Sequence, residues 1–260
     1  MKSSVFAVGC DMGSLTVKLA LIFNDTILDY AIAKSGVQPV QTAEALLDQL
    51  LIQNHKTIKD IDICISTGYG RHNVSFADDN RSEISCHAAG AFFLQPNVRT
   101  VIDIGGQDCK VISLNDKGQM NNFVMNDRCS AGTGHCMEHL ANILGISVEK
   151  MGQMRPILPF IPKISNKCSI FMELEVLQLL VNKHSIRKIS AGIADAVARR
   201  IATLAGGISM QKAICLTGGV SNNIMVIKYL QKYLKTSFVS LPHDPQIIGA
   251  IGAAVMGIQL

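Results

Sequence analysis

The sequence contains no tryptophan, few charged residues and no long apolar run. Its charged share is 17%, below the roughly 25% that is typical of soluble proteins. We therefore expect part of the surface to be covered by a partner or by a second copy of the chain. The formal net charge of +4 is scattered, without a Lys/Arg block or an interleaved aromatic stripe. This pattern argues against nucleic acid as a partner.

Signals for secretion, for membrane insertion and for a disulfide scaffold are also missing. Asp11 and Lys18 interrupt the apolar start, and the near-apolar tail 247–258 is shorter than the ~18 residues that span a bilayer. The eight cysteines form no Cys-x-x-Cys pair. Cys64 and Cys215 lie in apolar, strand-like runs and are predicted to be small buried side chains. We expect a protein of the cytoplasm, in a reducing compartment.

Strand and helix patterns alternate along the chain, which predicts the α/β class. One strand ends at Asp11, turns through glycine and leads into a second strand. The same pattern returns at Asp103, 92 residues further on (103 minus 11). Repeats of solenoids are about 20–50 residues long, so this spacing favours two lobes of similar build. We predict lobe I at 1–99, with 247–260 returning to it, and lobe II at 100–246.

Three strand ends carry loops of glycine and polar residues, at 11–14, 103–108 and 217–219. Glycine lets the backbone approach a ligand closely, and successive N–H groups in such turns bind anions. A single loop of this kind is more often just a tight turn. Three of them, two with an aspartate, favour a nucleotide held between two lobes, although no P-loop motif is present. Lys18 could reach a phosphate or point to solvent.

Side-chain chemistry suggests a role for each candidate. Asp11 and Asp103 would carry the hydration shell of Mg²⁺, which keeps most of its water in proteins. Ser14 and Thr16 would donate to phosphate, and Gln107 could orient the attacking water. The candidate nucleotide-binding residues of the three loops are Gly13, Ser14, Thr16, Lys18, Gly105, Gly106, Gln107, Gly218 and Gly219.

Two cysteines have polar neighbours and lie at predicted helix starts, namely Cys129 and Cys168. The helix dipole and the free amides there favour a thiolate, which is the form that binds a metal. An iron–sulfur cluster usually takes four cysteines, and two chains about a two-fold axis would supply four. The same pattern also allows two structural or low-pKa thiols. Cys136 could be a further ligand or could pack on its helix face.

Several longer segments carry a family resemblance and run in order across nearly the whole chain. They are 9–14, 67–71, 83–88, 101–108, 125–134, 171–176 and 217–220. The chain resembles the ATPase activators (component A) of 2-hydroxyacyl-CoA dehydratases, a family that includes the ATPase subunits of benzoyl-CoA reductase. The segment Asn126 to Gly134 is highly specific, whereas the glycine turns are shared with the wider actin, Hsp70 and sugar-kinase group.

The resemblance implies a duplicated two-lobe ATPase fold of the actin/Hsp70/sugar-kinase type. It also implies a homodimer that shares one 4Fe–4S cluster, held by Cys129 and Cys168 of lobe II in both subunits, and it places Gln246 near the adenosine. ATP binding and hydrolysis would change the angle between the subunits and drive one electron into a dehydratase or reductase component. A low-potential donor such as ferredoxin or flavodoxin would supply that electron.

Two other functions are compatible with the same residues. One is a small-molecule kinase with Asp103 or Asp108 as the base and with structural cysteines. The other is a nucleotide-binding regulatory module without turnover. Glu173 and Glu175 stand at i and i+2, do not share a helix face and are given no catalytic role.

Overall fold

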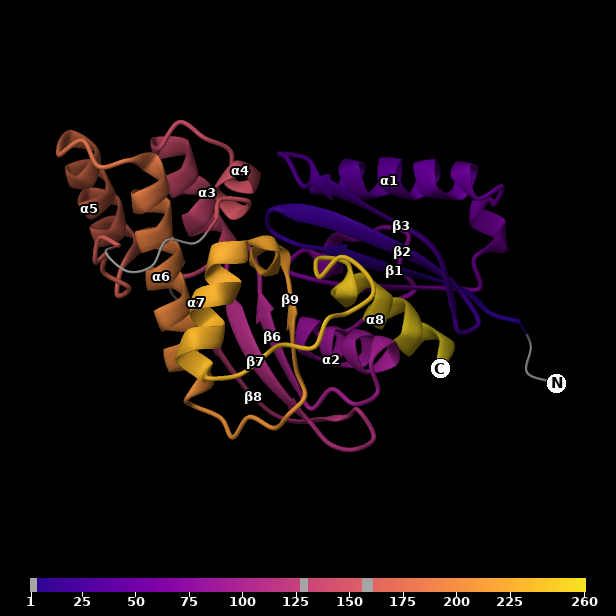
Figure 1. Cartoon of the computed structure of the whole chain (residues 1–260). Coiled ribbons are helices and arrows are strands. Elements are labelled where there is room, and N and C mark those ends of the chain that lie inside the picture. The colour runs from indigo at the N-terminus through magenta and orange to yellow at the C-terminus, as the bar shows by residue number, and fades with distance from the viewer. Residues whose placement is uncertain (1–3, 127–130, 156–160) are drawn as a thin grey trace. The chain divides into compact units, whose positions relative to one another are not determined.

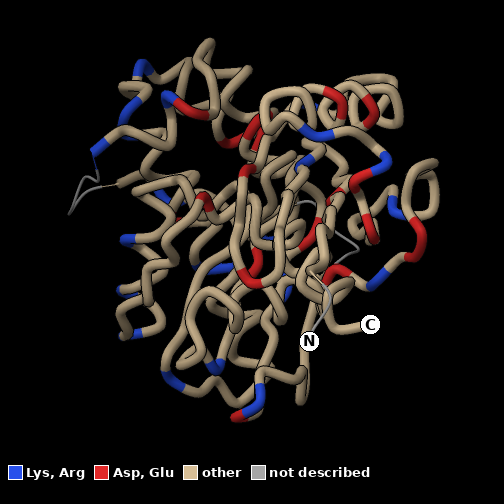
Figure 2. The backbone as a smooth tube through the Cα atoms, turned by 90° about the vertical axis from the view of Figure 1, so that its right-hand side faces the viewer, with Lys and Arg blue, Asp and Glu red and all other residues tan. Residues whose placement is uncertain are grey.

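The computed structural model describes residues 4–126, 131–155 and 161–260, so the predicted ligand Cys129 lies outside the described residues. Figure 1 shows the course of the chain, with its helices and strands labelled. Along the described backbone, Lys and Arg are interspersed with Asp and Glu, in keeping with the scattered charge of the sequence (Figure 2).

The chain divides into two compact units. Unit 1 comprises Met1–Val101, Leu114–Asn121 and Leu241–Leu260, and unit 2 comprises Ile102–Ser113 and Asn122–Ser240. The sequence-based proposal of two lobes placed its boundaries near residues 100 and 246. Unit 1 differs from that proposal because it also contains residues 114–121, between two strands, and residues 241–246, before the last helix.

Unit 1 contains a five-stranded sheet in the order β3-β2-β1-β4-β5, in which β1 is antiparallel to β2 and parallel to β4. Its strands are β1 (Phe6–Met12), β2 (Thr16–Phe23), β3 (Thr26–Lys34), β4 (Ile63–Thr67) and β5 (Asp79–Asn80). Its helices are α1 (Pro39–Gln53), η1 (Ile58–Asp60), η2 (Arg71–Asn73), α2 (Glu83–Leu94) and α8 (Ile248–Ile258). The helical spacing of four leucines in the sequence predicts a helix near residues 42–53 with one apolar face. This prediction is confirmed, since Leu46, Leu47, Leu50 and Leu51 of α1 are buried.

Helix α8 lies against both β1 and α2 with glycines at the points of contact (Figure 1). A Cβ on Gly9 would lie 1.9 Å from the carbonyl oxygen of Ala250, and one on Gly252 would lie 1.7 Å from that of Cys86. Only glycine permits such an approach of two backbones. This close packing brings the N-terminus of α8 to the end of β1, where Asp11 lies.

Unit 2 contains most of a four-stranded sheet in the order β8-β7-β6-β9. Its strands are β6 (Thr100–Ile104), β7 (Cys109–Leu114), β8 (Met120–Asn126) and β9 (Ile214–Thr217). Its helices are α3 (Gly134–Ile143), α4 (Val148–Gly152), α5 (Ser169–Val181), α6 (Ile186–Ala205), η3 (Gly219–Asn222) and α7 (Ile224–Leu234). The two sheets share one arrangement. The strand that carries the repeated aspartate, β1 or β6, lies between its hairpin partner, β2 or β7, and a third strand, β4 or β9, that ends at a threonine followed by a glycine.

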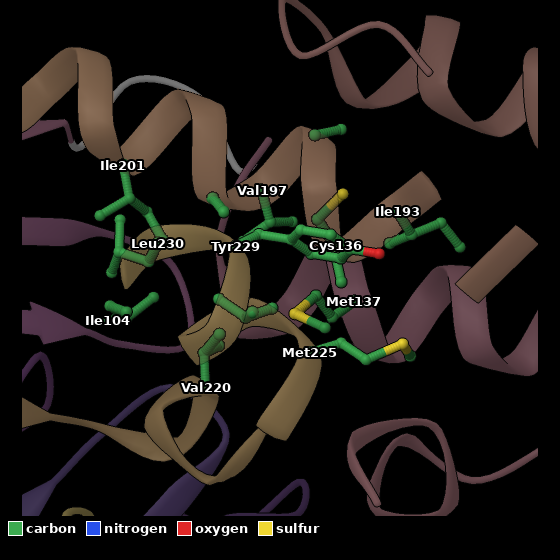
Figure 3. Packing of buried hydrophobic residues seen from close by; sticks show 14 of the residues in the cluster. Ile104, Cys136, Met137, Ile193, Val197, Ile201, Val220, Met225, Tyr229 and Leu230 are labelled. Atoms are coloured by element: carbon green, nitrogen blue, oxygen red, sulfur yellow. The ribbon is translucent and has the colours of Figure 1, made fainter. Parts of the chain in front are cut away.

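The core of unit 2 forms where α6 and α7 pack on the sheet. Figure 3 shows Tyr229 of α7 among Val197 and Ile193 of α6 and Cys136 of α3, and all four are buried. The helical spacing of the apolar residues in 185–205 predicts one inward face, made of Ile186, Ile189, Ile193, Val197, Ile201 and Leu204. The prediction is confirmed for Ile189, Ile193, Val197 and Ile201, which are buried, and Leu204 is partly buried against the same core. Ile186 is an exception, at 38% exposed, because the first turn of α6 and the residues before it extend beyond the core.

Helix α3 begins at Gly134, later than the start expected near Cys129. Gly132 has a φ of +90°, which is not a helical conformation and which favours glycine. The turn at Gly132 therefore delays the helix, and Thr133 becomes its N-terminal cap residue.

Candidate functional site

One group of candidate site residues lies in unit 1, at the end of β1. Asp11 is only 4% exposed, and Lys18 Nζ donates a hydrogen bond to its Oδ2 at 3.0 Å. The two residues face each other because β1 and β2 pair with Asp11 opposite Lys18. Of the two orientations open for Lys18, the structure shows the inward one, in an ion pair with a buried carboxylate.

The predicted phosphate-binding residues of unit 1 form the turn between β1 and β2. The Gly13 amide donates to the carbonyl of Thr16 at 3.0 Å, and Ser35 Oγ donates to the carbonyl of Gly13 at 2.8 Å. Ser14 and Thr16 are partly exposed in this turn. These two hydrogen bonds therefore fix the backbone of the turn, while Ser14 and Thr16 stay accessible to a ligand.

Two glycines surround the Asp11 carboxylate. Gly68, directly after β4, has a φ of +90°, and a Cβ on it would lie 2.5 Å from Asp11 Oδ1. Gly249 lies at the start of α8, where a Cβ would be 3.0 Å from Asp11 Oδ2 and 3.0 Å from His87 Nε2. A side chain at either glycine would fill the space beside the carboxylate. Neither glycine was singled out from residue chemistry, since only the fold brings them to Asp11.

A second group of candidate site residues lies in unit 2, at the end of β6. Asp103 is 2% exposed, and its Oδ1 accepts a hydrogen bond from Thr217 Oγ1 at 3.0 Å. Lys110 Nζ lies 3.4 Å from Asp103 Oδ2 and 2.5 Å from Asp108 Oδ1. Gly218 has a φ of +83°, and a Cβ on it would lie 2.8 Å from Asp103 Oδ1. Asp103 is thus held between the end of β9 and the lysine of β7.

The two groups of residues, one in each unit, repeat each other in detail. Each aspartate ends the first strand of a hairpin, each has a lysine partner seven residues later, and each touches a left-handed glycine after a neighbouring strand. Lys110 was not among the sequence-derived candidates. The 92-residue repeat that relates Asp11 to Asp103 also relates Lys18 to Lys110, so the repeat alone could have identified it.

Lys110→Met is expected to lower the free energy of unfolding by about 3 kcal/mol, because it leaves a buried carboxylate without its cation. Urea denaturation followed by circular dichroism measures this change. Lys117→Met, at an exposed position of the β7–β8 turn, is the matched control and should leave the midpoint unchanged. Equal midpoints for Lys110→Met and the wild type would contradict a structural role of the ion pair.

The loop after Asp103 is joined to the start of α3. The amides of Gly134 and His135 donate to the carbonyls of Gly105 and Gly106, at 2.9 and 2.8 Å. Gln107 is exposed at the tip of the same loop. These two hydrogen bonds therefore link the position of the loop to the first residues of α3.

Cys168 occupies the N-terminal cap position of α5 and is partly exposed. All other described cysteines are buried, as predicted for Cys64 and Cys215, and burial raises the pKa of each of these two thiols to about 12. Cys136 packs in the core, where its Sγ lies 3.9 Å from Met172 Sδ. Among the described cysteines, only Cys168 is therefore placed to reach a ligand at the surface.

Helix α5 presents an apolar stripe to solvent in the helical turns that follow Cys168. Its side chains recur at intervals of three or four residues and are 42–80% exposed. They are Ile170, Leu174, Leu177 and Val181, with Phe171 beside them. An exposed apolar face of this kind is typical of a surface that is covered by another protein.

The remaining predicted residue, Gln246, lies just before α8, where its amide donates to Asp244 Oδ1 at 2.9 Å. In the described ranges, no three His, Cys, Asp or Glu side chains gather into a metal site. No helix of this described part is both long and apolar enough to cross a membrane.

Comparisons with known proteins extend over nearly the whole chain. It is 39% identical over 253 residues to the activator of lactoyl-CoA dehydratase from Anaerotignum propionicum, with 96% of each protein covered. Component A of the (R)-2-hydroxyglutaryl-CoA dehydratase from Acidaminococcus fermentans has a TM-score of 0.92 at 35% identity, with 98% of each chain covered. The activator of 2-hydroxyisocaproyl-CoA dehydratase from Clostridium difficile, solved with bound ADPNP, also has a TM-score of 0.92 at 35% identity, covering 98% of this chain and 95% of that one.

A ROK family protein from Streptococcus pneumoniae shares only the fold, at 13% identity and a TM-score of 0.51. The predicted actin-like and sugar-kinase-like fold class is confirmed by these structures. A family model described as the BadF/BadG/BcrA/BcrD ATPase family matches residues 8–257. With a buried aspartate and a glycine turn repeated in both units, the chain belongs to the BadF/BadG/BcrA/BcrD ATPase family.

Proposed function

We propose that this chain is an ATP-dependent activator that delivers one electron to a 2-hydroxyacyl-CoA dehydratase or to a related reductase component. The names of its relatives give the class of partner. The observation that carries the proposal is the pair of hydrogen bonds from Gly134 and His135 to Gly105 and Gly106. They connect the candidate phosphate loop to the helix that follows the cysteine segment, so a nucleotide could act on that segment.

In this proposal the two repeated half-sites bind ATP with Mg²⁺. Asp11 and Asp103 hold the hydrated metal, since buried carboxylates beside glycine turns suit a cation that keeps its water. The turn with Ser14 and Thr16 and the loop with Gly105 and Gly106 approach the phosphates, together with Gly13, Gly218 and Gly219. Lys18 neutralises the carboxylate next to these phosphates, and Gln246 lies near the adenosine.

Cys168 fits the proposed iron–sulfur group by its chemistry and by its place. It is a thiol at a helix N-terminus, where the dipole favours the thiolate, and its side chain is partly exposed. With Cys129 it gives two ligands per chain, so a homodimer would provide the usual four. When bound, a 4Fe–4S cluster supplies one-electron transfer at low potential.

The apolar stripe of α5 supports the proposal that the chain works in an assembly. It begins two residues after Cys168 and remains exposed over the length of the helix. Burying it against a second copy or against the dehydratase component would bring a protein surface to the Cys168 end of α5. A ferredoxin or flavodoxin would supply the electron that is passed on.

Anaerobic purification tests this function. We expect iron, a brown absorption band, hydrolysis of ATP, and ATP-dependent reduction of a dehydratase component when reduced ferredoxin is the donor. Phosphate transfer to a sugar or an acid, in a protein without iron, would instead support a small-molecule kinase. Nucleotide binding without release of phosphate would support a regulatory module.

Gln107→Ala is expected to retain ATP binding but to slow hydrolysis roughly 10- to 100-fold, because the exposed amide at the loop tip no longer orients the attacking water. Measurement of kcat and KM by phosphate release separates the two effects. Gln53→Ala, at the exposed end of α1, is the control. Unchanged turnover in the Gln107 variant would remove this residue from the proposed mechanism.

A further inference from the structure

Two charged side chains hold residues 164–167, the segment that leads into α5 and that we term the entry segment. Arg199 Nη2 donates to the carbonyl of Ile164 at 2.6 Å. Glu175 Oε2 accepts from the amide of Ser165 at 2.6 Å. The entry segment has no helix or strand of its own, so these contacts with α6 and α5 set its path.

A third charged side chain holds the C-terminal half of the entry segment. Arg200 Nη1 donates to the carbonyl of Asn166 at 3.0 Å and lies 3.4 Å from that of Lys167, the residue before Cys168. The stem of Arg200 packs on Gly132, where a Cβ would lie 3.1 Å from Arg200 Cδ. Arg200 therefore contacts both the entry segment, which leads to Cys168, and Gly132, which follows the other proposed ligand, Cys129.

The neighbouring arginines of α6 differ in how their charges are balanced. Arg199 Nε pairs with Asp195 Oδ2 at 2.9 Å, which neutralises its charge. Arg200 has no carboxylate partner among the residues that the structure describes, and its Nε is buried without a hydrogen bond there. A positive charge without a described counterion thus lies beside the backbone that leads to Cys168.

We propose that Arg200 is a positioning residue that sets the path of the Cys168 segment and, by its charge, raises the reduction potential of the group bound there. The proposal rests on the function proposed above. Reduction adds one negative charge to a cluster that already has thiolate ligands, and a nearby cation stabilises the more negative state. Hydrogen bonds and charges outside the ligand shell commonly tune metal sites in this way.

The effect of the Arg200 charge is tested by a potentiometric titration of anaerobic protein that is monitored by visible absorption. At a fixed solution potential, Arg200→Gln is expected to raise the ratio of oxidised to reduced cluster about tenfold. This change corresponds to a reduction potential that is lower by about 59 mV. Arg200→Lys keeps the charge and should stay close to the wild type. Arg187→Gln, exposed in the first turn of α6, is the matched control and should not change the potential.

The positioning role is tested on iron-free protein by hydrogen exchange of the peptide that covers residues 163–169. Both Arg200 variants should exchange faster than the wild type and the Arg187 variant, because neither replacement reproduces the guanidinium contacts. Wild-type exchange in both Arg200 variants would overturn the positioning role. An unshifted potential in iron-loaded Arg200→Gln would overturn the electrostatic role. If the glutamine variant does not fold, a shift of about 59 mV to lower potential in Arg200→Lys, which keeps the charge, would overturn that role instead.

These outcomes separate this inference from the proposed function. A wild-type protein without iron would reject the electron-transfer function, and the exchange experiment would still decide whether Arg200 orders the entry segment. A wild-type protein that binds iron, together with variants that match it in potential and exchange, would reject only the role of Arg200.

Discussion

Cys168→Ala is expected to abolish iron binding and activation of a dehydratase component, while ATP hydrolysis continues in the same protein. Cys168 is the one partly exposed thiol among the described cysteines, so its loss removes two of the four proposed ligands of a dimer. The nucleotide residues lie in other elements and keep their contacts. Iron analysis of anaerobic protein, expected to fall from about four atoms per dimer to nearly none, measures the effect.

Cys64→Ala is the matched control for this experiment. Cys64 is buried in β4, where burial raises the pKa of its thiol to about 12, so its removal should leave the iron content unchanged. Full iron content in Cys168→Ala would contradict a shared cluster held by Cys168. Loss of ATP hydrolysis along with iron would show that the variant had lost more than a ligand, and Cys168→Ser would then be used to preserve the packing of α5.

Asp11→Asn is expected to lower the rate of ATP hydrolysis at least about a hundredfold, because a neutral amide no longer attracts the hydrated Mg²⁺ and leaves Lys18 without its anion. The side chain keeps its shape in the narrow space between Gly68 and Gly249, so the fold should be maintained. Phosphate release at several Mg²⁺ concentrations measures the effect, and the melting temperature checks the fold.

The control for this variant is Asp25→Asn in the exposed turn between β2 and β3, which removes the same charge far from the end of β1. Wild-type hydrolysis by Asp11→Asn would exclude Asp11 from the metal site. If Asp103→Asn alone were inactive, the two repeated half-sites would have different roles despite their similar construction.

Much of the architecture follows from local patterns in the sequence. The hydrophobic spacing of α1 and α6 identified their buried faces, and the repeated strand-Asp-glycine pattern identified a duplicated α/β fold. These predictions succeeded because periodicity and turn chemistry are local properties of the chain. Errors occurred at the ends of helices, namely at the start of α3 and at the exposed Ile186 of α6. At such positions the local pattern of residues does not show where the helix begins or where the buried core ends.

The network around the candidate site could not be derived from composition or spacing. Glu175 received no catalytic role because it does not share a helix face with Glu173, yet it accepts a hydrogen bond from Ser165 ten residues earlier. Arg200 was not singled out at all, although it reaches back 34 residues to Asn166. Neither contact has a sequence pattern, because both depend on how α5 and α6 pack.

Patterns in the sequence were sufficient to predict the fold class, the family, the glycine turns at the strand ends and the burial of cysteines in apolar strands. Three features became visible only in the folded chain: Lys18 and Lys110 pair with buried aspartates, Gly68, Gly218 and Gly249 border those carboxylates, and charged side chains hold the entry segment. The difference comes from the separation along the chain of the residues that interact. Periodicity and turns act within a few residues, whereas an ion pair or a close backbone approach exists only after packing has joined distant segments.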